Sequence, residues 1–102
     1  MSKTSYQVRL LSVAEDDLGG ILAYVTENNR VAAADLLDKF EMCFERLSVN
    51  PHLGKAAQEE PLISLGYRYL VVSNYLVFYV VREKTVVIHR VIHGARKYAD
   101  FF

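Results

Sequence analysis

The sequence predicts an α+β fold in which an antiparallel helical hairpin packs on an antiparallel four-stranded sheet. Residues 66–102 hold three runs rich in Val, Ile, Tyr and Phe, a composition that favours strands. The gaps between these runs are short enough for hairpins, so we expect a three-stranded antiparallel meander. Residues 12–49 instead repeat apolar side chains at helical spacing. The order is strand, helix, helix and three strands.

Residues 5–11 alternate apolar and polar side chains and predict a short edge strand. A first helix follows, because Ser12 and Glu15 have the spacing of a capping box, in which the two side chains satisfy unpaired amides at a helix start. Asp16 and Asp17 add negative charge where the helix dipole favours it. We expect the helix to stop at Asn28-Asn29 through a left-handed residue. Its apolar stripe consists of Ala14, Leu18, Ile21, Leu22 and Val25.

A second helix is predicted over Arg30 to Val49, with one apolar face and one charged face. It ends at Asn50-Pro51, because the residue before proline is pushed out of helical geometry. The short link between the helices predicts an antiparallel hairpin laid across one face of the sheet. Residues 50–61 show no periodicity and predict a surface loop.

The predicted meander strands cover residues 67–72, 75–80 and 86–93, with gaps at Ser73-Asn74 and at residues 82–85. A half-buried sheet alternates apolar and polar side chains. These runs do not, so we expect helices over one face and partial cover over the other. The last run ends in a polar cluster that does not fit a core: His89, Arg90, His93, Arg96, Lys97 and Tyr98.

The length of 102 residues and the 52% hydrophobic content predict one domain spanning residues 1–102. The single cysteine, Cys43, cannot form an internal disulfide, and we expect it only to pack. No apolar run reaches the roughly twenty residues of a membrane span, and the first residues do not resemble a signal peptide. We therefore expect a cytoplasmic protein without a membrane partner.

The net charge of zero is unevenly distributed along the chain. Residues 1–64 carry six basic and ten acidic side chains, a net of −4, whereas residues 65–102 carry six and two, a net of +4. Either the sheet half meets an anionic partner, or the two halves complement each other within the fold.

Most catalytic motifs are absent: the sequence has no glycine-rich phosphate loop, no HExxH and no GxSxG. His89 and His93 lie four residues apart in one predicted strand, which places them on the same face about 13 Å apart. That distance is too large for two ligands of one metal ion, so we expect no metal and no cofactor.

One group of side chains remains that could act on RNA. Arginine binds phosphate through two hydrogen bonds, histidine transfers protons near neutral pH, and tyrosine stacks on bases. Cleavage of RNA without a metal needs a base, a cation and an acid. The residues that could supply them are Arg68, His93, Arg96 and Tyr98. The alternative is structural: Arg96 and Lys97 cap the end of the sheet and Tyr98 packs under the helices.

Three segments carry a resemblance to a known family: residues 65–68 (LGYR), residues 75–79 (YLVFY) and, above all, residues 90–96 (RVIHGAR). With the order of elements, they resemble the RelE/ParE superfamily of toxins from bacterial type II toxin-antitoxin modules. The resemblance implies a small α+β toxin that forms a hetero-oligomer with a cognate antitoxin. An amphipathic helix or an added strand of the antitoxin would suit the apolar groove between sheet and helices. Phe101 and Phe102 are aromatics that a partner could cover.

The superfamily divides by target. RelE-like members cleave messenger RNA in the ribosome. They resemble one another in sharing an arginine at the position where this chain has Leu76. ParE-like members, known for poisoning DNA gyrase, resemble this chain better, with an apolar residue at that position. The expected function is therefore inhibition of DNA gyrase by binding, with a ribosome-dependent mRNA endonuclease as the alternative. A third possibility is a degenerate member that only binds its antitoxin. The expected target-binding residues are Arg68, Arg90, His93, Arg96, Lys97 and Tyr98.

Overall fold

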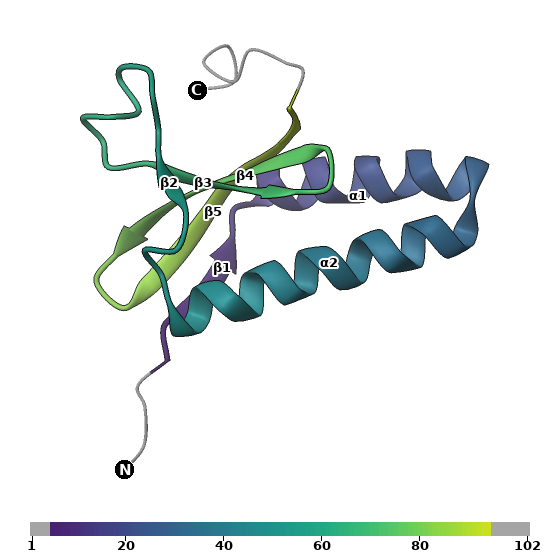
Figure 1. Cartoon of the computed structure of the whole chain (residues 1–102), viewed down its shortest axis with the longest axis horizontal. Coiled ribbons are helices and arrows are strands. Elements are labelled where there is room, and N and C mark those ends of the chain that lie inside the picture. Colours follow the sequence, from purple (N-terminus) through teal and green to yellow (C-terminus); the bar gives the residue numbers. More distant parts are fainter. Residues whose placement is uncertain (1–4, 95–102) are drawn as a thin grey trace.

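The computed structural model describes residues 5–94 and contains two helices and five strands (Figure 1). Their order confirms the predicted α+β class. The elements are β1 (Gln7–Leu10), α1 (Ser12–Asn28), α2 (Arg30–Val49), β2 (Lys55–Ala56), β3 (Arg68–Val72), β4 (Tyr75–Arg82) and β5 (Thr85–His93).

The sheet has the strand order β1-β5-β4-β3-β2, and β3, β4 and β5 form the predicted antiparallel meander. Ser73 and Glu83 adopt positive φ angles of 56° and 55° at the two hairpin turns. Two details of the prediction are wrong. The strand β1 pairs with β5 in parallel, because two intervening helices carry the chain back across the sheet. A fifth strand, β2, lies inside the predicted loop and pairs with Arg68 and Tyr69.

The helix ends also differ from the predicted caps. The N-cap of α1 is Leu11, Ser12 is already helical, and no side chain caps the helix, so the expected capping box does not form. Asn29 is extended, with a φ of −162°, rather than left-handed. Its Oδ1 accepts a hydrogen bond of 3.1 Å from the Ala32 amide, so Asn29 caps the start of α2.

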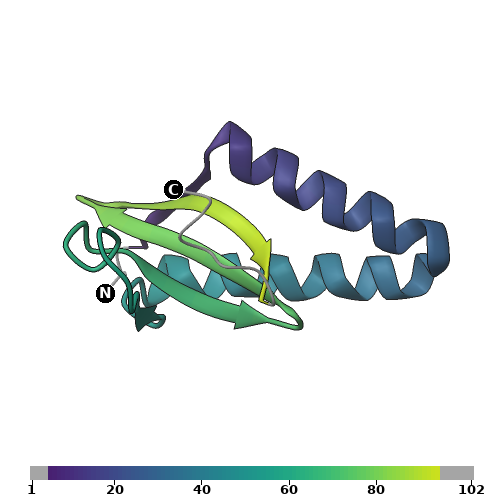
Figure 2. The ribbon, with the colours of Figure 1, turned by 90° about the horizontal axis from the view of Figure 1, so that it is seen from above.

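Both helices pack on one face of the sheet, where the main core lies (Figure 2). Phe40 and Leu47 of α2 and Ala14 of α1 are completely buried there. Their sheet partners in this core include Val77, Tyr79, Val86, Ile88 and Val91. Phe78 and Val80 alternate with these residues and are buried too, which explains why neither sheet face is clearly polar in the sequence. Within residues 5–94, neither helix is both long and apolar enough to span a membrane.

Candidate functional site

The strand β5 contains a one-residue bulge at His89. Val91 pairs with Val77 and Arg90 with Phe78, but Ile88 pairs with Tyr79, which leaves no residue opposite His89. A bulge of this kind shifts the alternation of side chains on one strand. His93 therefore lies on the helix-covered face, opposite Tyr75, whereas His89 lies on the other face. The expectation that both histidines share a face is wrong.

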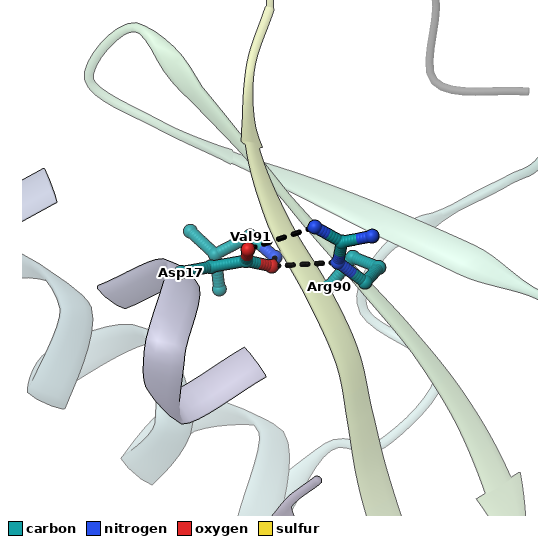
Figure 3. A network of polar contacts seen from close by, with 3 residues as sticks. All are labelled: Asp17, Arg90 and Val91. Carbon is teal, nitrogen blue, oxygen red and sulfur yellow. Dashed lines mark hydrogen bonds and ion pairs between the residues drawn. The ribbon is translucent and has the colours of Figure 1, made fainter. Parts of the chain in front are cut away.

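Arg90 is held by Asp17 of α1 (Figure 3). The Nε and Nη2 atoms of Arg90 donate to Oδ2 and Oδ1 of Asp17 at 2.7 and 2.8 Å. The Asp17 Oδ2 atom also accepts a 3.0 Å hydrogen bond from the Val91 amide. The strand β1 pairs with β5 only as far as Ile88, so Asp17 occupies the edge that β1 leaves. The hydrogen bonds to Asp17 raise the pKa of Arg90 against the opposing effect of burial.

His93 lies beside this ion pair at the end of β5. Its ring contacts the Tyr75 ring edge to face, with the centroids 5.4 Å apart. A shallow hollow of about 200 Å³ separates this end of the sheet from α1, and Arg90, His93, Tyr75, Asp17 and Ile21 line it. Two of the predicted binding residues, Arg90 and His93, thus meet at one surface. The predicted residues Arg96, Lys97 and Tyr98, like Phe101 and Phe102, lie outside the described residues.

Arg68 lies elsewhere. It pairs with Tyr79 on β4, whereas His93 pairs with Tyr75, so the two lie about 13 Å apart along the strand direction. The Nη1 atom of Arg68 donates to the carbonyl oxygen of Gly54 at 2.8 Å. The structure therefore does not bring Arg68 and His93 together.

Tyr67 and His89 form a polar pair that the sequence reasoning missed. The Tyr67 hydroxyl lies 2.5 Å from Nδ1 of His89. Burial, and then the nearby Arg90 charge, lower the pKa of His89, while burial raises the pKa of Tyr67. The neutral imidazole is thus favoured, and the tautomer of the ring decides whether the tyrosine hydroxyl donates to Nδ1 or accepts from it. Only the strand register brings these residues together, because 22 positions separate them in the chain.

A second surface lies between α2 and β3, and we call it the α2–β3 trough. It has a volume of about 320 Å³. Met42 and Val71 are 51% and 63% exposed and both line it, so the trough presents apolar surface of the kind found at interaction sites. The strand β2 pairs only with Arg68 and Tyr69, so among the described residues no strand covers the outer edge of β3 beyond Tyr69. The residues that line the α2–β3 trough are Lys39, Met42, Cys43, Arg46, Leu53, Leu70, Val71, Val72 and Ser73.

Cys43 is buried in the lining of this trough. Burial raises the pKa of its thiol to about 11, although Arg46 opposes the shift. The thiol is therefore protonated near neutral pH and shielded while the trough keeps this structure. In residues 5–94, no three His, Cys, Asp or Glu side chains gather closely enough to hold a metal ion.

The chain is similar to known toxin-antitoxin proteins in family and in structure. Residues 8–98 match the model of the ParE toxin of the type II toxin-antitoxin system parDE. No curated protein matches the chain in sequence. A chain of the chromosomal ParDE toxin-antitoxin system from P. aeruginosa superimposes with a TM-score of 0.71 at 18% identity, covering 90% of this chain and 98% of that one. A chain of the toxin-antitoxin complex RelBE2 from Mycobacterium tuberculosis gives 0.62 at 28% identity, covering 93% and 98%.

Proposed function

Because the chain belongs to the family of ParE toxins of type II toxin-antitoxin systems, we propose that it inhibits DNA gyrase by binding it and that a cognate antitoxin silences it. The family model covers residues 8–98, which include the helical hairpin and all the strands except Gln7, the first residue of β1. A toxin of this kind acts in the cytoplasm, where its target and its antitoxin are made.

The observation that carries the choice of gyrase is the nature of the residues around β4. Leu76 stands at the position where RelE-like nucleases share an arginine. Leucine cannot stabilise charge on a phosphate. Arg68 is bonded to the carbonyl oxygen of Gly54 and pairs with Tyr79, four residues along β4 from the partner of His93. These positions favour binding over phosphate cleavage. Arg90, His93 and the following residues Arg96, Lys97 and Tyr98 would then contact the target.

The α2–β3 trough is the surface that we assign to the antitoxin. Its exposed apolar side chains and the uncovered edge of β3 suit an apolar segment that adds a strand or lays a helix along the trough. Lys39 and Arg46 lie on its α2 side, so carboxylates on that segment would be favoured. The trough and the β5 end involve different residues, which allows one partner to bind each.

A supercoiling assay tests the choice of target. Purified gyrase should lose supercoiling activity in the presence of a stoichiometric excess of the toxin, and His93→Ala should restore most of that activity. Pre-incubation with the product of the reading frame adjacent to the toxin gene should restore it fully. Undiminished supercoiling at excess wild-type toxin would exclude gyrase as the target.

Ribosome-dependent cleavage of mRNA is the second candidate. The Tyr67–His89 pair favours it, because a neutral imidazole hydrogen-bonded to a tyrosine can move a proton. Similarity to the RelBE2 complex, at 28% identity, also favours it. Primer extension on translated messages after induction should then reveal new 5′ ends, and Tyr67→Phe or His89→Gln should abolish them. Messages without new ends would eliminate this candidate.

A further inference from the structure

The segment of residues 51–55, which we call the strap, is fastened to the sheet by two side chains. The hydroxyl of Tyr79 accepts a 2.8 Å hydrogen bond from the Gly54 amide, and Nη1 of Arg68 donates to the Gly54 carbonyl oxygen at 2.8 Å. Gly54 is buried, and a Cβ atom there would lie only 2.7 Å from the carbonyl oxygen of Tyr69. The strap is therefore pressed against β3 and β4 at this point.

Leu53 of the strap lines the α2–β3 trough and is 42% exposed. It also lines a neighbouring hollow of about 460 Å³ along the end of α2, together with Glu45, Arg46, Val49 and Asn50. Leu53 thus stands where the two hollows meet. Any movement of the strap moves Leu53 and changes the shape of the trough.

Tyr79 reaches the strap from inside the core. Its side chain is completely buried and belongs to the same core cluster as Cys43, which lines the trough. Burial raises the pKa of Tyr79, so its hydroxyl stays protonated at neutral pH. A buried hydroxyl that accepts one backbone hydrogen bond fixes the backbone of Gly54 next to Leu53.

We infer that Tyr79 and Arg68 hold the strap as a fixed wall of the α2–β3 trough and are positioning residues for the partner segment that docks there. This inference rests on the proposed function of the trough as the antitoxin surface. A wall that is ordered before binding loses no conformational entropy when the partner arrives, and this preorganisation increases affinity. Arg68 acts in this way on the antitoxin side rather than through the target.

Cys43 reports on the wall without any partner, because it is the only cysteine in the chain and is buried in the lining of the trough. Tyr79→Phe and Arg68→Met should each increase the rate of native-state labelling by a thiol reagent about tenfold, the factor expected for loss of one buried hydrogen bond. The matched controls are Tyr69→Phe, whose ring packs on Phe78, and Arg82→Met, whose guanidinium donates to the Leu65 carbonyl oxygen. Urea melts correct for labelling through global unfolding. Labelling rates equal to the controls would overturn the inference.

Affinity provides a second measurement, with the purified product of the adjacent reading frame as the probe. Tyr79→Phe should weaken binding about tenfold. In a Leu53→Ala background the same change should have no further effect on the Kd, although it still lowers the Tm, because Tyr79 acts on binding through Leu53. Additive effects on binding, or a lowered Tm with an unchanged Kd, would refute a positioning role.

The two proposals fail in different ways. If the wild-type toxin does not bind the adjacent gene product at all, the proposed antitoxin surface is wrong, and the labelling of Cys43 alone decides whether Tyr79 and Arg68 fix the wall. If binding occurs and labelling does not respond to Tyr79→Phe, the surface stands and the positioning inference is wrong.

Discussion

Asp17 connects the first helix to the uncovered end of β5 with one carboxylate. It forms an ion pair with Arg90 and also accepts a hydrogen bond from the Val91 amide. The side chains of Arg90 and Asp17 are only 16% and 15% exposed, so water screens this pair less than a surface pair. Asp17 therefore stabilises the contact between α1 and β5, in addition to its expected role of complementing the helix dipole.

Replacing Asp17 tests this role. Asp17→Asn should lower the free energy of unfolding by about 1–3 kcal/mol, because it leaves Arg90 without its charged partner and weakens the bond to Val91. Asp16→Asn is the matched control, since Asp16 is the exposed neighbour and should change stability by less than about 0.5 kcal/mol. Urea denaturation followed by circular dichroism measures both. Equal losses would show that the ion pair does not stabilise the fold.

His89 makes stability depend on pH. Burial lowers its pKa below the ordinary value of 6.5, so the folded state favours the neutral ring and the unfolded state binds protons more readily. This contribution to stability is present above pH 6.5 and is lost as the pH falls from that value towards the lowered pKa. Urea denaturation at about pH 7.5 and about pH 5.5 should show a smaller loss for His89→Gln than for the wild type. His52→Gln, in an exposed position, should behave like the wild type.

The sequence predicts a polar cluster at the end of β5 but not the partners of its members. Arg90 and His93 belong to the predicted polar cluster, yet Asp17 was expected only to complement the helix dipole, because it stands 73 positions before Arg90. The Tyr67–His89 pair depends on the bulge in β5, which periodicity does not reveal because a single extra residue looks like continued strand. Contacts across elements require the register, and the register is set in three dimensions.

Among the elements, the approximate bounds expected for α2 agree with the structure, since its apolar side chains keep helical spacing and a proline follows the helix. The pairing of the first strand is harder to predict from the sequence. Alternation in residues 7–10 identifies β1 but does not say whether it pairs in parallel, and four residues of pairing are too few to be recognised. The two-residue β2 is shorter still and is defined only by its partner β3.

The helix α1 can be stabilised by substitution at Gly19 and Gly20. Both are exposed, and a Cβ atom at either position would meet nothing within 4 Å, so no packing partner requires glycine. Gly19→Ala and Gly20→Ala should each raise the free energy of unfolding by about 0.5–1 kcal/mol, because alanine restricts the unfolded chain and favours the helix. Gly66→Ala is the contrasting control and should destabilise, since Gly66 has a φ of +81°. Thermal melts measure all three, and destabilisation by Gly19→Ala would indicate a contact that the backbone geometry does not show.

At the scale of the molecule, the two surfaces lie on different elements. The α2–β3 trough runs along α2 and the far edge of the meander, whereas the hollow with Arg90 and His93 lies between α1 and the end of β5. The strands β3, β4 and β5 join them through one sheet. If the first surface binds the antitoxin and the second binds the target, substitutions should separate neutralisation from toxicity.

Val71→Glu tests this separation, because Val71 is 63% exposed in the trough and its replacement should leave the core intact. A carboxylate there would neutralise the field of Lys39 and Arg46 and repel an acidic antitoxin segment. The variant should bind the adjacent gene product at least about tenfold more weakly, as expected for an unpaired charge at an interface. It should still arrest growth, now even when that product is co-expressed.

The matched control is Val31→Glu, at a position on α2 that is 71% exposed and outside the lining of the trough, and it should remain neutralised. His93→Ala should show the reverse pattern, with antitoxin binding retained and growth arrest lost. Loss of both activities in Val71→Glu with an unchanged Tm would mean that antitoxin and target share one surface.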